Sequence, residues 1–335
     1  MTSSRIGSKV LLSAATLLLG LVFLEAVFRV LGLAPDVTRI EIDEPYGQFV
    51  SSENPVLRYV PKPGAGDIND YGIRDYDYPI EKGPGVFRIV VIGDSIGYGL
   101  CTEDEALAID DVFPKVLERR LRQGSKAGSV EVINLSVSGY DTTQEVEFLV
   151  QKGLDLSPDL VVLAYCMNDA LIASAELAAF EKQPGFRLGQ QVSQQIFLKS
   201  HLARLFWQAS VGQSSSGGQR AGRKKVNRAF DRLQTLSAER DFPVVVTIFP
   251  LFVREGSAWV KQQRIAPGDA ARARGFGVLD LFSDFDPTVP ANIVRYQGRC
   301  THEHPNESGH ALAAESIERY LAEQGLWPWA PAGGR

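Results

Sequence analysis

The sequence predicts a three-layer α/β/α sandwich around a five-stranded parallel sheet, and two observations support this fold class. Five short runs are rich in β-branched and other apolar residues, and their apolar positions are nearly continuous instead of alternating. Continuous apolar runs are typical of strands that are covered on both faces, as in a parallel sheet. Helical patterns separate the runs, and this alternation indicates helices on both faces of the sheet. For a chain of this size we expect a flavodoxin-like strand order.

The predicted strands and helices alternate along residues 87–282. The predicted strands are residues 87–93, 130–135, 159–165, 242–249 and 276–282. Helical patterns lie between them, in the segments DDVFPKVLERRLRQ, TQEVEFLVQKGL and VNRAFDRLQTLSAERD. Asp110 or Asp111 is the candidate N-cap of the first helix, and the basic residues at its end suit the helix dipole. Residues 208–224 are predicted to form a mobile surface linker, because they are rich in Ser, Gly and Gln.

Composition divides the chain into four parts. Residues 1–34 begin with basic side chains and a long apolar run. Residues 35–85 are rich in Pro, Gly, Asp and Tyr, and they are predicted to form an extended lead-in with many turns. Residues 86–325 hold the strands and helices of the main domain, and residues 326–335 form a short tail.

The N-terminal part has the features of an export segment. Arg5 and Lys9 precede an uncharged apolar run. The run reaches the length of a membrane-spanning helix, about 20 residues, only if it continues to residue 33. Glu25 and Arg29 lie four residues apart in this continuation, so they can pair on one face of a helix.

We interpret residues 10–33 as an uncleaved, single-pass membrane anchor. The basic residues before the span then stay in the cytoplasm, and the main domain is periplasmic or extracellular. A signal peptide cleaved after Ala34 is one alternative, although Pro35 disfavours cleavage at that site. A buried core helix is the other alternative.

Charge and cysteine content narrow the function classes. The net charge of −5 argues against a nucleic-acid partner, which would require a basic face. The three cysteines do not have the spacing of a metal site. Cys101 and Cys166 are expected to fill small apolar spaces, and a disulfide between Cys101 and Cys300 is an alternative for the first of them.

Chemically useful residues follow several of the predicted strands. Ser95 follows the first strand in GDSIGYG, Gly139 follows the second in SVSGYDTTQ, and Asn168 follows the third in CMNDA. His304 precedes a helical pattern near the C-terminus. Ligands of open parallel sheets bind beyond the carboxyl ends of the strands, so we expect these residues to meet there. A serine, a histidine, a backbone donor and a side-chain amide are sufficient for acyl transfer.

Four of these segments, GDSIGYG, SVSGYDTTQE, MND and HPNESGH, resemble the ordered blocks of the SGNH, or GDSL-type, hydrolases. The resemblance covers about residues 86–322 and implies the SGNH hydrolase fold for the main domain. It also implies that Ser95 is the nucleophile and His304 the base. The oxyanion hole would consist of the backbone N–H groups of Ser95 and Gly139 and the side-chain amide of Asn168.

The lead-in adds a second resemblance. Anchored bacterial members of the family often carry an Asn-x-x-Gly-x-Arg segment, and Asn69, Gly72 and Arg74 match it.

One position departs from the family pattern. The family usually has Asp three residues before the histidine, and this chain has Thr301. Loss of the orienting acid in a serine protease costs about 10⁴ in rate. A backbone carbonyl is one substitute, as in dyad members of the family, and Asp280 or Asp286 is another. An impaired enzyme is the remaining possibility.

The expected function is that of a serine esterase that removes a small acyl group, such as acetyl, from a glycan or lipid without a cofactor. Three alternatives remain: transfer of the acyl group to a sugar hydroxyl at the same site, a non-catalytic glycan-binding domain, and a metal site. The metal site would use His302, His304 and His310 with Glu303. Tyr98 and Tyr140 flank the expected site, where packing is their expected role and stacking on a sugar the alternative.

Overall fold

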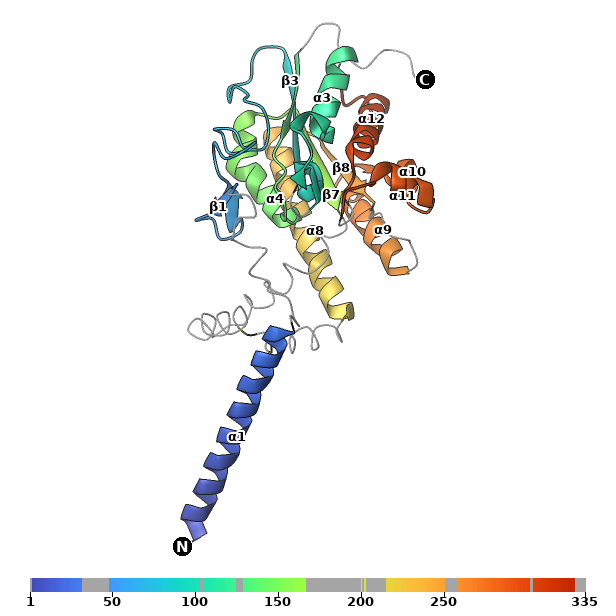
Figure 1. Cartoon of the computed structure of the whole chain (residues 1–335). Coiled ribbons are helices and arrows are strands. Elements are labelled where there is room, and N and C mark those ends of the chain that lie inside the picture. The colour runs from blue at the N-terminus through green and yellow to red at the C-terminus, as the bar shows by residue number, and fades with distance from the viewer. Residues whose placement is uncertain are drawn as a thin grey trace. The chain divides into compact units, whose positions relative to one another are not determined.

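The computed structural model divides the chain into two compact units. One unit consists of Met1–Asp43 and Glu176–Gly218, and the other of Glu44–Ala175 and Gln219–Arg335. The first unit contains helix α1, Thr2–Val30, and the second contains the sheet (Figure 1). The structure describes residues 2–31, 48–102, 105–124, 129–166, 200, 202, 215–250, 258–301 and 304–328.

Five parallel strands form the sheet of the described residues, in the order β6-β3-β7-β8-β9. This is the flavodoxin-like order, and it confirms the predicted fold class. Each strand begins within two residues of its predicted start, and most residues of β3, β7 and β8 are buried as expected, whereas β9 at the edge of the sheet is only half-buried. The strands are β3 Val86–Gly93, β6 Ser129–Asn134, β7 Leu160–Cys166, β8 Val244–Phe249 and β9 Gly277–Asp280.

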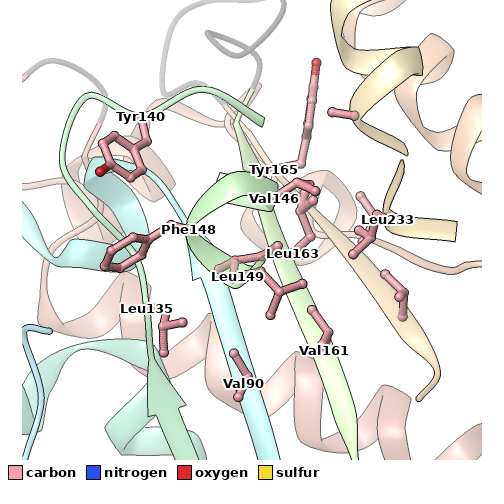
Figure 2. Close-up of a cluster of buried hydrophobic side chains, with 14 of the residues drawn as sticks. Val90, Leu135, Tyr140, Val146, Phe148, Leu149, Val161, Leu163, Tyr165 and Leu233 are labelled. Atoms are coloured by element: carbon pink, nitrogen blue, oxygen red, sulfur yellow. The ribbon is translucent and has the colours of Figure 1, made fainter. Parts of the chain in front are cut away.

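Helices cover both faces of this sheet. Side chains alternate across a strand, so Ile89 and Val91 of β3 pack with α3 and α12, whereas Val90 and Ile92 pack with α4, α8 and α9. Figure 2 shows part of the cluster on the face that α4 covers, where Val90 of β3 and Val161 and Leu163 of β7 belong to the same buried core as Phe148 of α4. The covering helices are α3 Phe113–Gly124, α4 Thr142–Phe148, α8 Ser215–Arg240, α9 Ala258–Arg272 and α12 Glu307–Glu323.

Shorter elements connect these layers. The lead-in contributes a two-stranded sheet, and a second two-stranded sheet follows the turn after β3. A π-helical turn and a 3₁₀ turn continue α4 toward β7. These elements are β1 Phe49–Ser51, β2 Tyr59–Pro61, α2 Ser95–Tyr98, β4 Leu100–Thr102, β5 Glu105–Ala106, η2 Ile109–Asp111, η3 Leu149–Gly153, η4 Leu154–Leu156, α10 Phe282–Phe285 and α11 Pro290–Tyr296.

Two boundaries differ from the sequence-based predictions. The expected linker of residues 208–224 overlaps α8, which begins at Ser215. Its Gln, Arg, Ala and Lys residues are good helix formers, and the packed turns around Phe230 allow the helix to extend toward the N-terminus. Asp110 and Asp111 lie in η2, one turn before α3 begins.

Helix α1 covers most of the N-terminal apolar run. Arg29 pairs with Glu25 at 3.0 Å, as predicted from their spacing. Large apolar side chains such as Leu17 and Phe23 are exposed on this helix. Over the ranges that the structure describes, no helix combines the length and the hydropathy needed to span a membrane.

The lead-in segment packs against the turn that follows β3. The side-chain amide of Asn69 donates to a backbone carbonyl of the same loop, and its side-chain oxygen accepts from a backbone N–H of that loop. Gly72, in the same loop, adopts a φ of +80°. Arg74 is 2% exposed, and it donates to the carbonyl oxygens of Tyr98 at 2.7 Å and Leu107 at 2.6 Å. The Asn-x-x-Gly-x-Arg segment therefore ties the lead-in to the end of α2.

A buried charged cluster joins the lead-in to α3. Nζ of Lys115 lies 2.9 Å from Oδ1 of Asp75 and 3.2 Å from Oε2 of Glu118, and it donates to the Tyr78 hydroxyl at 2.7 Å. The backbone N–H of Asn134 donates to the other Asp75 oxygen at 2.7 Å. Burial raises the pKa of the Asp75 carboxyl, and the Lys115 ammonium opposes this shift.

Replacing Lys115 tests how strongly this cluster holds the lead-in. Lys115→Met leaves Asp75 buried without its cation, while Glu118 keeps its ion pair with Arg122, so we expect the free energy of unfolding to fall by about 3–5 kcal/mol. Arg119→Met on the same helix is the control, because it breaks only the exposed pair with Asp110 and should cost less than about 1 kcal/mol. Denaturant titration measures both changes, and equal losses would contradict the assigned role of the buried cluster.

Candidate active site

The turn after β3 presents Ser95 at the carboxyl edge of the sheet. Asp94 is the N-cap of α2, and its carboxylate accepts from the backbone N–H of Ile96 at 2.9 Å. Ser95 is the first residue of this short helix, and Gly99, with a φ of +87°, is its C-cap. The sequence Asp-Ser therefore places the hydroxyl at the start of a capped turn at the carboxyl end of β3.

Glycine is required on both sides of Ser95. A Cβ atom on Gly93 would lie 2.9 Å from Cβ of Ala164 on β7. A Cβ atom on Gly97 would lie 2.0 Å from Oγ of Ser136, which follows β6. Close packing of the serine turn against its neighbours explains these two glycines of the GDSIGYG segment.

His304 comes from the loop before α12 and meets Ser95 across 209 residues of sequence. Its Nε2 lies 2.8 Å from Oγ of Ser95, and its Nδ1 lies 2.9 Å from the carbonyl oxygen of Thr301. A carbonyl oxygen can only accept, so Nδ1 carries the proton and Nε2 presents its lone pair to the serine hydroxyl. Both side chains are less than a tenth exposed. The pair thus has the arrangement of a nucleophile and its general base.

The structure places neither candidate orienting acid on the histidine. Asp280 pairs with Arg264 at 3.0 Å and accepts from the backbone N–H of Phe282 at 3.0 Å. Asp286 accepts from the hydroxyl of Thr288. Of the substitutes considered for the missing acid, the structure therefore places the backbone carbonyl, that of Thr301, at Nδ1 of His304.

The expected oxyanion donors are placed in part. Gly139 lies in the turn after β6 with a φ of +80°, and the backbone of Ser95 lies at the start of α2. Asn168 lies outside the described residues, two positions after Cys166 at the end of β7. Tyr98 and Tyr140 are each 3% exposed, which agrees with their expected packing role.

A disulfide joins the two halves of the site. Cys101 of β4 is bonded to Cys300, so the expectation that Cys101 fills a small apolar space is wrong. Thr301 follows Cys300, and its backbone N–H donates to the carbonyl oxygen of Cys101 at 2.7 Å. The segment after Ser95 is thus linked covalently to the segment that orients His304. Cys166 is buried, as expected.

The second buried histidine has a separate role. Nδ1 of His310 accepts from the backbone N–H of Phe113 at 3.2 Å. Burial, together with the nearby His304 and Arg74, lowers the pKa of His310 to about 3. His310 therefore stays neutral and caps the first turn of α3.

His302 and Glu303, two members of the alternative metal site, lie outside the described residues. The other two members, His304 and His310, direct ring nitrogens to Ser95 and to the backbone of Phe113. Within the described ranges, His, Cys, Asp and Glu side chains form no group of three or more that could hold a metal ion.

A parallel α/β/α sandwich with a hydrogen-bonded serine and histidine at the carboxyl edge of its sheet defines a serine acylhydrolase. The model of the GDSL-like Lipase/Acylhydrolase family matches residues 91–312, which is more than half of the chain. The chain belongs to this family and is a carboxylic ester hydrolase. The Ser95 turn and the His304 loop both lie within the matched residues.

Several solved structures are similar to the chain at low sequence identity. A lipase/acylhydrolase from Enterococcus faecalis is 18% identical, with a TM-score of 0.45 over 71% of this chain and 96% of its own. TesA is 15% identical, with a TM-score of 0.46 over 71% and 99%. The acetyl xylan esterase AlAXEase is 14% identical, with a TM-score of 0.43 over 70% and 100%. No protein of curated function matches the chain in sequence.

Breaking the disulfide tests whether it holds the Ser95 and His304 segments in register. We expect the double variant Cys101→Ser, Cys300→Ser to lose about 2–5 kcal/mol of unfolding free energy. Because Thr301 then moves relative to α2, kcat should fall on the order of 10- to 100-fold at a temperature where the variant stays folded. Reduction of the wild type should reproduce the loss and leave the variant unaffected. A folded, reduced protein with wild-type kcat would refute this role.

Restoring the family residue tests the orientation of His304. Thr301→Asp should leave kcat close to that of wild type, since the backbone carbonyl at this position already holds Nδ1–H. Thr301→Asn is the matched neutral control. Steady-state kinetics distinguish the outcomes: a large gain in kcat for the Asp variant alone would mean that the ring lacks an effective orienting partner.

Proposed function

We propose that this protein is a serine esterase that removes a small acyl group, such as acetyl, from a glycan or lipid through an acyl-enzyme on Ser95. One observation carries the proposal, the contact of 2.8 Å between Oγ of Ser95 and Nε2 of His304. Membership of the GDSL-like Lipase/Acylhydrolase family supports the reaction class.

In the first half of the reaction, Oγ of Ser95 attacks the carbonyl carbon of the ester while Nε2 of His304 takes the hydroxyl proton. The imidazolium keeps its Nδ1–H on the Thr301 carbonyl. The backbone N–H groups of Ser95 and Gly139 and the amide of Asn168 stabilise the oxyanion. His304 then protonates the leaving alcohol, and the acyl group stays on Ser95.

In the second half, water replaces the alcohol. His304 takes a proton from the water, the hydroxide oxygen attacks the acyl carbon, and the carboxylic acid leaves as Ser95 regains its proton. No cofactor is needed in either half.

A series of p-nitrophenyl esters of increasing acyl length tests the proposal. We expect the highest kcat/KM for acetyl, with Ser95→Ala and His304→Ala each removing nearly all activity and the double variant losing little more. His310→Asn is the control on the same part of the chain, and it should change stability more than kcat. Wild-type turnover by Ser95→Ala would refute the assignment.

The two alternatives give different outcomes in the same assay. Addition of a sugar acceptor would divert the acyl group from water to the sugar if the protein is an acyltransferase. A wild-type protein that is inert on every ester and still binds glycans would be a binding module.

We also propose that the N-terminal segment exports the catalytic domain and holds it at the membrane. Arg5 and Lys9 before the apolar run support export. The Cys101–Cys300 disulfide supports an oxidising compartment. Exposed apolar side chains on α1, including Leu17 and Phe23, support a membrane contact.

A reporter fused after residue 40 tests export, and we expect activity only outside the cytoplasm. Mass analysis of the mature protein in the membrane fraction should still find the residues before Pro35. Reporter activity in the cytoplasm would contradict export, and a mature protein that begins at Pro35 would contradict the anchor and favour a cleaved signal.

A further inference from the structure

We propose that Tyr59, from the lead-in, is a positioning residue that holds the backbone N–H of Gly139 toward the oxyanion. The Tyr59 hydroxyl donates to the carbonyl oxygen of Ser138 at 2.6 Å. This role rests on the proposed function, because it concerns an oxyanion donor of the same site. It adds a side chain that lies upstream of the sheet and outside the family match.

The hydrogen bond acts on the peptide unit between Ser138 and Gly139. In a planar trans peptide, the C=O and N–H groups point in opposite directions. Fixing the Ser138 carbonyl on Tyr59 therefore directs the Gly139 N–H away from Tyr59. The orientation of the expected donor is thus set by a side chain that need not touch the substrate.

This peptide is the central one of a β-turn. Tyr140 N–H donates to the carbonyl oxygen of Val137 at 3.2 Å, which closes a four-residue turn with Ser138 and Gly139 at its centre. The φ of +80° at Gly139 is typical of the third position of a type II turn. Type I and type II turns differ by a flip of the central peptide, and the flip would reverse the N–H. The Tyr59 hydrogen bond favours type II.

Gly139 and Tyr59 also fit each other sterically. A Cβ atom on residue 139 would lie 2.6 Å from the Tyr59 hydroxyl oxygen. Glycine is therefore needed here for two reasons, the positive φ and the close approach of the phenol. The contact is specific to the hydroxyl, since the next Tyr59 atom near that position lies at 3.8 Å.

Packing holds the Tyr59 ring in place. Its centroid lies 5.5 Å from that of Phe49 on the paired strand β1 and 5.2 Å from that of Tyr140. The Tyr140 hydroxyl donates in turn to the Tyr59 carbonyl oxygen. The ring is thus held from both sides. In addition, the Tyr59 hydroxyl, by donating to the Ser138 carbonyl, polarises that peptide and makes the Gly139 N–H a stronger donor.

Tyr59→Phe tests the proposal because it removes the hydroxyl and keeps the ring. Removing a whole oxyanion donor costs about 10²–10³ in kcat, so loss of its orientation should cost on the order of tenfold or more. We expect KM and the thermal midpoint to stay near wild type. A small alkyl boronic acid, which forms a tetrahedral adduct on the serine, should bind more weakly by the same factor as kcat/KM.

Tyr71→Phe is the matched control. Its hydroxyl also donates from the lead-in to a backbone carbonyl, that of Lys152, at 2.7 Å. This variant should keep wild-type kcat and boronic acid affinity, so a general loosening of the lead-in would be visible as a change in both variants.

The outcomes separate this inference from the proposed function. If Ser95→Ala is inactive and Tyr59→Phe matches wild type in kcat and boronic acid affinity, the role of Tyr59 is wrong and the esterase assignment stands. A lower thermal midpoint with unchanged boronic acid affinity, or equal losses in Tyr71→Phe, would also overturn the inference. If Ser95→Ala is active, the proposed function itself fails.

Discussion

The hydrogen bond between Nδ1 of His304 and the carbonyl oxygen of Thr301 decides which ring nitrogen is free to accept a proton from Ser95. A carbonyl has no proton to give, so this bond selects the tautomer with its lone pair on Nε2. In triad hydrolases a carboxylate performs the same selection and also stabilises the imidazolium. Here the Thr301 carbonyl, a neutral dipole, accepts from Nδ1, so the orientation of the ring depends on the position of that carbonyl.

A carbonyl of the backbone is placed only as well as the segment that carries it, and the surrounding structure fixes that segment. The disulfide from Cys101 fixes the chain immediately before Thr301, and the Thr301 N–H bonds back to the Cys101 carbonyl. Arg74 holds the far end of the serine-bearing turn from within the lead-in. The lead-in also reaches the Gly139 turn through Tyr59. The lead-in therefore contacts two of the loops that form the site, the Ser95 turn and the Gly139 turn.

The sequence predicted the sheet and the Ser95–His304 contact well, because both follow from strong local signals. Continuous apolar runs identify buried parallel strands, and their carboxyl ends bring distant loops together. The role of the Thr301 carbonyl was less predictable, since every residue carries a carbonyl group. The disulfide was not predictable from spacing, because Cys101 and Cys300 meet only through the fold. Tyr59 resembles several other tyrosines of the lead-in, and only the turn beside it identifies its role.

Peptide mapping after reaction with a fluorophosphonate is the decisive test of the serine–histidine pair, because the reagent bonds covalently to a serine that an adjacent base has activated. We expect one adduct per molecule, on the peptide that contains Ser95, and no adduct in His304→Ala. Cys166, Ser136 and the other nearby nucleophiles should stay unmodified. An adduct on a different residue, or equal labelling of Ser95 in the presence and absence of the His304 ring, would contradict the account.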